Sequence, residues 1–242
     1  MKIKIHEMSF SGLYEYTMCP LKFKYNKIDK LIPEFTPATL AFGSGVHSAL
    51  EAYYKNIQAG KKILDLPVLV NIVRNSLEND TIRFDKESKQ ELIDKSAVML
   101  EKAIQMPVGN IIGTEVPVEI EIDSGFKVIG RIDLLSEESG DLVVTDFKTA
   151  CKKPSEKDVN SNLQLTTYSN VYPDAKLRIR ALTKTKNPDC VDIYTDRSDA
   201  ERTRVKKMFA AVKGSIEANS FFPNEGWQCA GCQYQYQCHK DF

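Results

Sequence analysis

The sequence lacks the features that would place a protein in a membrane or direct it out of the cell. None of its apolar runs approaches the ~18 consecutive residues that a membrane-spanning helix needs. The opening MKIKIHEMSF has no apolar core of the kind found in a secretory signal peptide. We therefore expect a cytoplasmic protein with no membrane partner.

The chain also lacks a net charge, because 33 basic residues balance 33 acidic ones. This balance gives no overall indication of nucleic-acid binding, although a local basic patch would suffice for it. Two groups of basic residues are candidates for such a patch, and the alternative for both is a solvated surface. They are Lys22, Lys24, Lys27 and Lys30, and Lys176, Arg178, Arg180, Lys184 and Lys186.

Internal repeats, low-complexity segments and a phosphate-binding G-x-x-x-x-G-K-[ST] loop are all missing, so the chain carries no helicase motor of its own. Its 242 residues fit a single domain, 1–242. Within it we expect a mainly helical region at 1–110, a sheet core at 111–196, and a helix with a cysteine-rich tail at 197–242.

Hydrophobic periodicity and turn residues predict an α/β fold. Residues 32–41 read as a loop. Three β-rich runs joined by tight turns, 114–123, 126–135 and 141–150, predict an antiparallel meander. Further strands are expected at 175–184 and 190–195. Helices are expected at 9–28 with a break at Pro20, and at 44–58, 66–79, 87–105, 156–171 and 198–219.

An aspartate and a lysine point the same way from an apolar strand. Asp146 and Lys148 are two apart in LVVTDFK and so share one face. Burying such charges is costly unless a cation and a phosphate accompany them. The triplet alone is weak, because chance predicts roughly four acidic-x-basic triplets in this composition. We read two others, Glu87-Ser88-Lys89 and Asp174-Ala175-Lys176, as surface.

The neighbouring runs add further carboxylates. Asp133 lies in VIGRIDLL, and Glu115 opens EVPVEIEI. Carboxylates on adjacent strands make a suitable half-shell for Mg²⁺ or Mn²⁺. Lys148 would then orient the attacking water and stabilise charge on a phosphate.

At this point the sequence resembles the RecB-like branch of the PD-(D/E)XK nucleases. Four motifs stand in the family order, although Ile132 replaces the proline in the superfamily's name. They are Gly43-Ser-Gly-Val-His47, Gly130-Arg-Ile-Asp133, Asp146-Phe-Lys148 and Gln164-Leu-Thr-Thr-Tyr168. The resemblance implies a restriction-endonuclease-like core, a mixed sheet flanked by helices, and metal-dependent hydrolysis of DNA.

The resemblance also implies a role for each motif residue. The metal ligands would be His47, Asp133, Asp146 and the Phe147 carbonyl. Lys148 would be catalytic together with Asp133, Asp146 and an upstream acid, Glu115. Gln164 and Tyr168, four apart on one helix face, would contact DNA or hold Lys148. Taken singly, each residue has an alternative reading. For His47 it is a helix residue satisfied by Glu51, and for Glu115 it is a charge at the end of a strand. For Gln164 and Tyr168 it is an ordinary amphipathic helix.

Six cysteines are present, three of them in a C-x-x-C-x-x-x-x-x-C tail. Thiols so spaced in a cytosolic-looking chain favour metal binding over disulfides. Cys19, beside Pro20, is the best fourth ligand for Cys229, Cys232 and Cys238. This split arrangement resembles the iron–sulfur RecB-like nucleases, including AddB-type helicase–nucleases and CRISPR-associated adaptation nucleases. It implies a 4Fe-4S cluster. Zinc is the alternative, with His239 as a possible ligand, and Cys151 and Cys190 read as free thiols.

Together these patterns favour an exonuclease acting on single-stranded DNA ends, with a helicase, integrase or recombination partner. The alternatives are a CRISPR adaptation nuclease that trims spacer precursors, and a catalytically idle DNA-binding or assembly subunit. Tyr14, Tyr16, Phe23 and Tyr25 would stack DNA bases, or else pack in the core.

Overall fold

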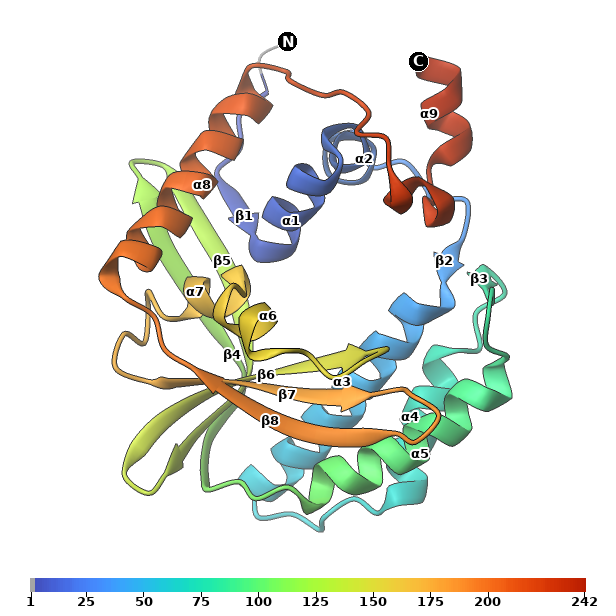
Figure 1. The fold of residues 1–242 in the computed structure, drawn as a ribbon, viewed down its shortest axis with the longest axis vertical. Helices are drawn as coiled ribbons and strands as arrows, with labels where there is room; N and C mark the ends of the chain where they lie inside the picture. Colours follow the sequence, from blue (N-terminus) through green and yellow to red (C-terminus); the bar gives the residue numbers. More distant parts are fainter. Residues whose placement is uncertain (1–2) are drawn as a thin grey trace.

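A six-stranded mixed sheet runs through the computed structural model, which describes residues 3–242 (Figure 1). Its strands are β1 (Glu7–Ser9), β4 (Asn110–Asp123), β5 (Phe126–Glu138), β6 (Asp141–Ala150), β7 (Lys176–Thr183) and β8 (Asp189–Thr195). Two short strands, β2 (Thr36–Pro37) and β3 (Ile82–Arg83), pair separately.

Helices flank this sheet, as the α/β reading predicted. The longer ones are α1 (Phe10–Met18), α3 (Ala38–Gln58), α4 (Leu66–Ser76), α5 (Lys89–Gln105) and α8 (Asp199–Glu217). The shorter ones are α2 (Pro20–Phe23), the π-helical η1 (Lys24–Ile28), α6 (Glu156–Asn160), α7 (Leu163–Tyr168), the 3₁₀ turn η2 (Trp227–Gly231) and α9 (Gln235–Asp241).

The predicted antiparallel meander of β4, β5 and β6 is confirmed by the strand register. A tight turn joins β5 to β6, with Ser139 at φ 55° and Gly140 at φ 87°. β7 then lies parallel to β6, and β8 lies antiparallel to β7. A mixed sheet flanked by helices is therefore the architecture of this chain.

The sheet forks at its centre. One edge of β5 pairs with β1 through residues 127–129 and with β6 through residues 134–138. Between these stretches, residues 130–132 pair with β4 alone. From Asp146 onward β6 pairs only with β7. The fork therefore opens beside Asp133 and Asp146, and side chains can reach this point from both faces of the sheet.

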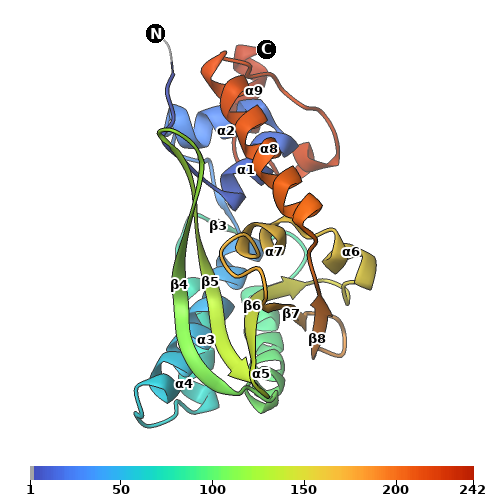
Figure 2. The ribbon, with the colours of Figure 1, turned by 90° about the vertical axis from the view of Figure 1, so that its left-hand side faces the viewer.

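Two groups of helices cover opposite faces of the sheet around the fork. α3, α4 and α5 enclose one core, to which the sheet contributes Leu134, Phe147 and Leu182. α7 packs Leu165 and Tyr168 onto the other face. Figures 1 and 2 show α1, α2, α8 and α9 at the end of the molecule where both termini lie.

The expected loop over residues 32–41 is wrong at its end, because α3 begins at Ala38, six residues before the predicted helix start. The added turn buries Ala41 and Phe42 in the core. Gly45 lies inside α3, where tertiary packing requires it. A Cβ there would lie 2.2 Å from the Ser76 Oγ of α4, so glycine permits the close approach of α3 and α4.

The single helix expected at 156–171 is also wrong, because the segment forms α6 and α7 instead. Ser155 caps the first helix and Asn162 caps the second, each accepting a main-chain N–H. At the second cap the chain changes direction between α6 and α7, so that α7 points toward the fork.

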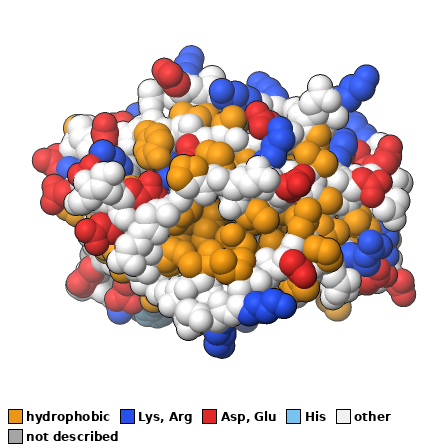
Figure 3. All heavy atoms as spheres, turned by 90° about the horizontal axis from the view of Figure 1, so that it is seen from below, with side chains coloured by type: hydrophobic (Ala, Val, Ile, Leu, Met, Phe, Trp, Pro, Cys, Tyr) orange, Lys and Arg blue, Asp and Glu red, His pale blue; other side chains and the backbone are white. Residues whose placement is uncertain are grey.

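The face opposite the termini carries apolar side chains at its centre and charged ones around them, as seen from below in Figure 3. Exposed apolar residues of α4 and β4 include Val68 and Ile112. No helix within residues 3–242 combines the length and hydrophobicity that crossing a bilayer requires.

Candidate active site

Asp146 is completely buried at the fork, with 0% of its surface exposed. Its Oδ2 forms an ion pair with the Lys148 Nζ at 2.8 Å. Neither carboxylate oxygen accepts a hydrogen bond from the described part of the chain. Burial raises the pKa of Asp146 to about 6, an effect that Lys148 partly offsets and Asp133 reinforces.

Asp133 stands at the opposite side of the fork and contacts both β6 and α3. Its Oδ2 accepts the Phe147 main-chain N–H at 2.6 Å and lies 3.5 Å from the His47 Nδ1. Burial alone would lower the pKa of His47, but the carboxylates of Asp133 and Asp146 outweigh it and raise that pKa. One third of the His47 side chain (33%) is exposed, so a ligand can reach the imidazole.

Glu115 enters the same site from β4. Its neighbours Thr114 and Val116 pair with Leu134 and Ile132, which places Glu115 across from Asp133. Burial raises the pKa of Glu115, and the nearby Asp133 and Glu51 raise it further. Glu51, one helical turn beyond His47 on α3, was considered in the sequence only as a hydrogen-bonding neighbour of His47.

A chain of hydrogen bonds holds the Lys148 ammonium group. Its Nζ donates to the Gln164 Oε1 at 2.8 Å, and the Gln164 Nε2 donates to the Tyr168 hydroxyl at 2.7 Å. That hydroxyl donates to the Arg131 carbonyl at 2.5 Å. Burial, followed by the charge of Asp146, raises the pKa of Tyr168, which keeps the phenol neutral. Gln164 and Tyr168 therefore lie where they can hold Lys148.

Arg197 fastens α7 in this position, and the sequence reading did not single it out. The guanidinium is almost fully buried, and its hydrogen bonds among the described residues go to hydroxyls and carbonyls rather than to carboxylates. Its five N–H groups donate to two threonine hydroxyls and three main-chain carbonyls, those of Thr166, Thr195, Val159, Asn162 and Asp196.

The donor set at the fork fits a divalent cation. A buried carboxylate without hydrogen bonds is costly, and an ion between Asp146 and Asp133 would remove that cost. Oxygen ligands with one imidazole suit Mg²⁺ or Mn²⁺. Among residues 3–242, no three His, Cys, Asp or Glu side chains already converge enough to hold a metal. The ion would have to draw its ligands together.

Comparison with known families agrees with this geometry. The family model described as the PD-(D/E)XK nuclease superfamily matches residues 7–239. The chain belongs to that superfamily.

Individual relatives are distant in sequence from this nuclease. The Gene 69 protein of Mycobacterium phage D29 is 25% identical over 268 residues, covering 98% of each chain. A crystal structure of a Eubacterium rectale protein, provisionally described as an exonuclease, is 14% identical with a TM-score of 0.62. That likeness covers 98% of the nuclease and 88% of the other chain, and it supports the fold. Nucleases of this superfamily usually use divalent metals such as Mg²⁺ or Mn²⁺.

Four cysteines of the nuclease line one cavity of about 880 Å³ between its N- and C-terminal segments. Three of them, Cys19, Cys232 and Cys238, pack against a small core that includes Tyr25 and Tyr234. Burial raises the pKa of the Cys232 and Cys238 thiols, and the charges of the neighbouring cysteines also raise it. Thiols suit a soft metal or a cluster, but among residues 3–242 no three of these thiols already converge enough to hold one.

The other two cysteines lie outside this cavity. Cys151 is exposed, and Cys190 is buried beside β7. Burial raises the pKa of Cys190 to about 11, which makes it an unreactive thiol.

The aromatic residues near Cys19 divide into two groups. Tyr16, Phe23 and Tyr25 are buried, as the core-packing alternative predicted, whereas Tyr14 is 53% exposed and lines the cysteine cavity. Trp227, which the sequence reading passed over, is 79% exposed and lines the same cavity. Its position next to the cysteine tail was the only available signal.

The second candidate basic patch is wrong for three of its five residues, while Lys176 and Lys186 are exposed. Arg178 and Arg180 are buried in β7, and Lys184 is 9% exposed because it pairs with Glu87. Alternation along β7 places both arginines on the face that α3 and α5 cover. Of the first patch, Lys22 and Lys27 line the cysteine cavity.

Proposed function

We propose that this protein is a metal-dependent deoxyribonuclease of the RecB-like branch, which degrades single-stranded DNA from an end. The observation that carries the proposal is the buried Asp146 carboxylate without hydrogen bonds, placed beside Asp133 and Lys148. A structural aspartate would have its oxygens satisfied within the fold.

The ligands of the cation would be His47, Asp133, Asp146 and the Phe147 carbonyl, with Glu115 as a further acid. A divalent cation held there supplies Lewis-acid activation of water and of the scissile phosphate. The Lys148 ammonium, held by Gln164, presents a positive charge to the phosphate as negative charge develops. Tyr168 keeps Gln164 turned toward Lys148.

A path for a single strand leads along α3 to this centre. Leu40 lines the cysteine cavity and lies seven residues before His47, hence on the same helix face and roughly 10 Å away along the axis. Gly43 and Ser44 lie between them on that face. Tyr14 and Trp227 offer exposed rings on which unpaired bases can stack.

Charge near the cavity is mixed. Lys22 and Lys27 can contact phosphates, while Glu15, which accepts two hydrogen bonds from Asn26, lies among the acidic lining residues. The face shown in Figure 3 has an apolar centre, which is poorly suited to a phosphate backbone. These features favour binding through base stacking at the cavity.

Cys19, Cys229, Cys232 and Cys238 would hold a 4Fe-4S cluster in this proposal, because all four line one cavity. The cluster would fasten the N-terminal helices to the C-terminal tail beside the DNA path. Zinc is the alternative ion, since His239 lines the same cavity.

The decisive experiment incubates the protein with end-labelled single-stranded, duplex and circular single-stranded DNA, with Mn²⁺ or Mg²⁺ and with EDTA. We expect metal-dependent loss of the linear single strand and survival of the circle. Asp146→Asn and Lys148→Ala proteins should fold but not cleave. Asp174→Asn is the matched control, because it alters an exposed acidic-x-basic triplet.

Each contrary outcome overturns a different part of the proposal. Cleavage in EDTA would contradict the metal mechanism, and cleavage of the circle would contradict exonuclease action. DNA binding without cleavage under any metal would favour the idle DNA-binding subunit.

Strand preference is tested with Tyr14→Ala and Trp227→Ala. Stacking contributes about 1–3 kcal/mol per base, so each variant should bind single-stranded DNA roughly 5- to 150-fold more weakly. Tyr236→Ala is the control, because Tyr236 is exposed on α9 but does not line the cavity. Unchanged affinity in both cavity variants would place the DNA path elsewhere.

A further inference from the structure

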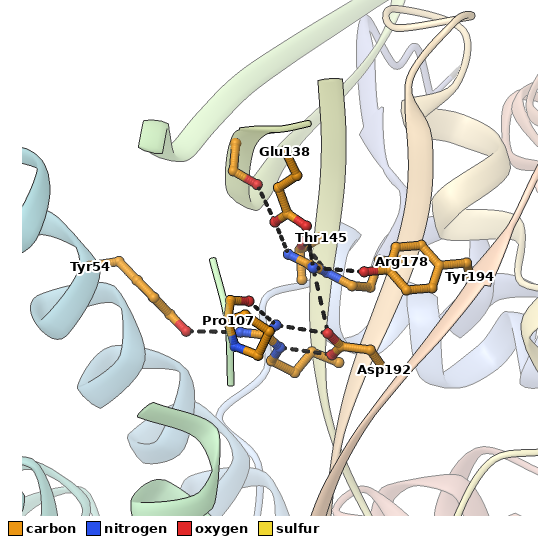
Figure 4. A network of polar contacts seen from close by, with 9 residues as sticks. Tyr54, Pro107, Glu138, Thr145, Arg178, Asp192 and Tyr194 are labelled. Carbon is orange, nitrogen blue, oxygen red and sulfur yellow. Dashed lines mark hydrogen bonds and ion pairs between the residues drawn. The ribbon is translucent and has the colours of Figure 1, made fainter. Parts of the chain in front are cut away.

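Two buried arginines on β7 anchor a polar network beneath the active site (Figure 4). Arg178 forms a bidentate pair with Glu138 at 2.9 and 3.0 Å. Arg180 forms another with Asp192, with both distances 2.8 Å. Two positive and two negative side chains therefore balance within the network, and this pairing makes burial of the arginines tolerable.

Arg180 extends the network to α3. Its Nη1 donates to the Tyr54 hydroxyl at 3.1 Å, and its Nη2 also donates to the Pro107 carbonyl at 2.9 Å. Burial raises the pKa of Tyr54 although Arg180 opposes the shift, so the phenol remains neutral. The Tyr54 ring is thus held at its hydroxyl end by a guanidinium that is itself fixed.

The Tyr54 ring in turn packs against the residue between the catalytic aspartate and lysine. It lies 9° from parallel to the Phe147 ring, with centroids 5.8 Å apart. The Phe147 ring then meets the His47 imidazole edge to face at 6.2 Å. His47 and Tyr54 are seven residues apart on α3, so both project from one face of the helix and contact Phe147.

The same phenylalanine carries the main-chain N–H that Asp133 accepts. A shift of Phe147 as a whole would therefore disturb His47 through the ring contact and Asp133 through the main-chain N–H. Among the described residues, Tyr54 provides the aromatic ring that lies parallel to the Phe147 ring, whereas the His47 ring meets it edge to face.

We propose that Tyr54, anchored by Arg180, is a positioning residue that aligns His47 and the Phe147 main chain for metal binding. The inference rests on the proposed metal-dependent function. It adds two residues, neither of which touches the metal or the DNA, as determinants of the metal site. Tyr54 acts through its ring and Arg180 acts through the Tyr54 hydroxyl.

The test measures Mn²⁺ affinity by calorimetry together with the metal-free nuclear magnetic resonance signal of the His47 imidazole. The chain has three histidines, so a His47→Gln protein assigns that signal. Tyr54→Leu, which removes the ring, should weaken Mn²⁺ binding about 10-fold or more and shift the His47 resonance. Tyr54→Phe, which keeps the ring but loses its anchor, should fall between Tyr54→Leu and wild type on both measures.

Tyr53→Leu is the matched control. Tyr53 is buried on the same helix turn and packs against Tyr54, but it makes no ring contact with Phe147. Wild-type Mn²⁺ affinity and His47 signal in Tyr54→Leu would overturn the proposal. So would an equal loss in Tyr53→Leu, which would indicate general loosening of α3. If Tyr54→Leu does not fold, wild-type values of both measures in Tyr54→Phe would overturn it.

The proposed function fails separately. If the wild-type and Asp146→Asn proteins bind Mn²⁺ equally, the metal site itself is misplaced. If wild type binds Mn²⁺ through Asp146 and cleaves DNA while the Tyr54 variants match it, only the positioning role is wrong.

Discussion

Glu115 faces Asp133 across β4 and β5 from a backbone in the left-handed region, at φ 50°. This conformation costs a non-glycine residue roughly 1–2 kcal/mol. The Glu115 carboxylate reaches the site despite this strain. Burial raises the pKa of Glu115, and the nearby Asp133 raises it further. Strain at an acidic residue inside a site indicates a function for that residue.

Glu115→Gly should therefore separate stability from activity. Glycine adopts φ 50° freely, so we expect the free energy of unfolding to rise by up to about 1 kcal/mol. Loss of the carboxylate should lower cleavage about 10-fold and raise the Mn²⁺ concentration needed for half-maximal rate. Denaturant unfolding and a metal titration of the rate measure the two effects.

Ser139→Gly provides the comparison, because Ser139 has φ 55° in the turn between β5 and β6, away from the site. It should gain similar stability and keep wild-type cleavage. Equal DNA cleavage by Glu115→Gly and Ser139→Gly would show that Glu115 is not part of the site.

Tyr168→Phe should lower the turnover rate more than DNA affinity. Without the hydroxyl, the Gln164 amide loses its acceptor and the Arg131 carbonyl loses its donor, so Lys148 is less firmly held. Leaving these groups unpaired should also cost about 1–3 kcal/mol of stability. Single-turnover cleavage at saturating DNA measures the rate after correction for folded protein.

Tyr172→Phe controls for the loss of a phenol. Its hydroxyl has no hydrogen-bond partner within residues 3–242, and the residue lies just beyond α7. A single-turnover rate in Tyr168→Phe equal to that of Tyr172→Phe would show that the hydrogen-bond chain does not support Lys148.

Protein purified without oxygen should be brown and contain about four irons per chain. Cys19→Ser should lose the iron as completely as Cys232→Ser, because both thiols line the same cavity. Each should also increase proteolysis of the two terminal segments that the cluster would join. Iron analysis, visible absorbance and limited proteolysis measure these losses.

Cys151→Ser should keep its iron, since that thiol is exposed and outside the cavity. Stoichiometric zinc without iron in anaerobic protein would refute the cluster. Full iron in Cys19→Ser would point to a different fourth ligand, and His239→Gln would then be examined.

Glu87 should make stability depend on pH in the acid range. Burial raises its pKa, but hydrogen bonds from Lys184 and Lys95 outweigh burial and lower it below the ordinary value. The folded state therefore binds this proton less readily than the unfolded state, and the stabilisation is present above the unfolded pKa of about 4.3. It is lost as pH falls through the lower folded pKa.

Glu87→Gln should accordingly cost about 1 kcal/mol at pH 7, and the difference from wild type should vanish near pH 3. Urea unfolding at several pH values measures this convergence. Glu78→Gln is the comparison, because its pair with Lys89 is more exposed and should contribute less. A constant difference between Glu87→Gln and wild type across the pH range would contradict the role of the ion pairs.

Short-range chemistry in the sequence determined the meander, the starts of α1, α5 and α8, and the order of the site motifs. Alternation along a strand and serine caps act over a few residues, so they can be read without the fold. Asp146 and Lys148 could be named for the same reason, because strand spacing puts them on one face, whereas Asp133 was named from the neighbouring strand and the order of the family motifs.

Tertiary structure alone decided the features that join distant segments. It buried Arg178 and Arg180, which read as a basic patch, because α3 and α5 cover that face of β7. It required Gly45 within a helix and placed Tyr54 on Phe147, contacts between elements far apart in the chain. Burial and packing arise only when those elements meet, so no local pattern records them.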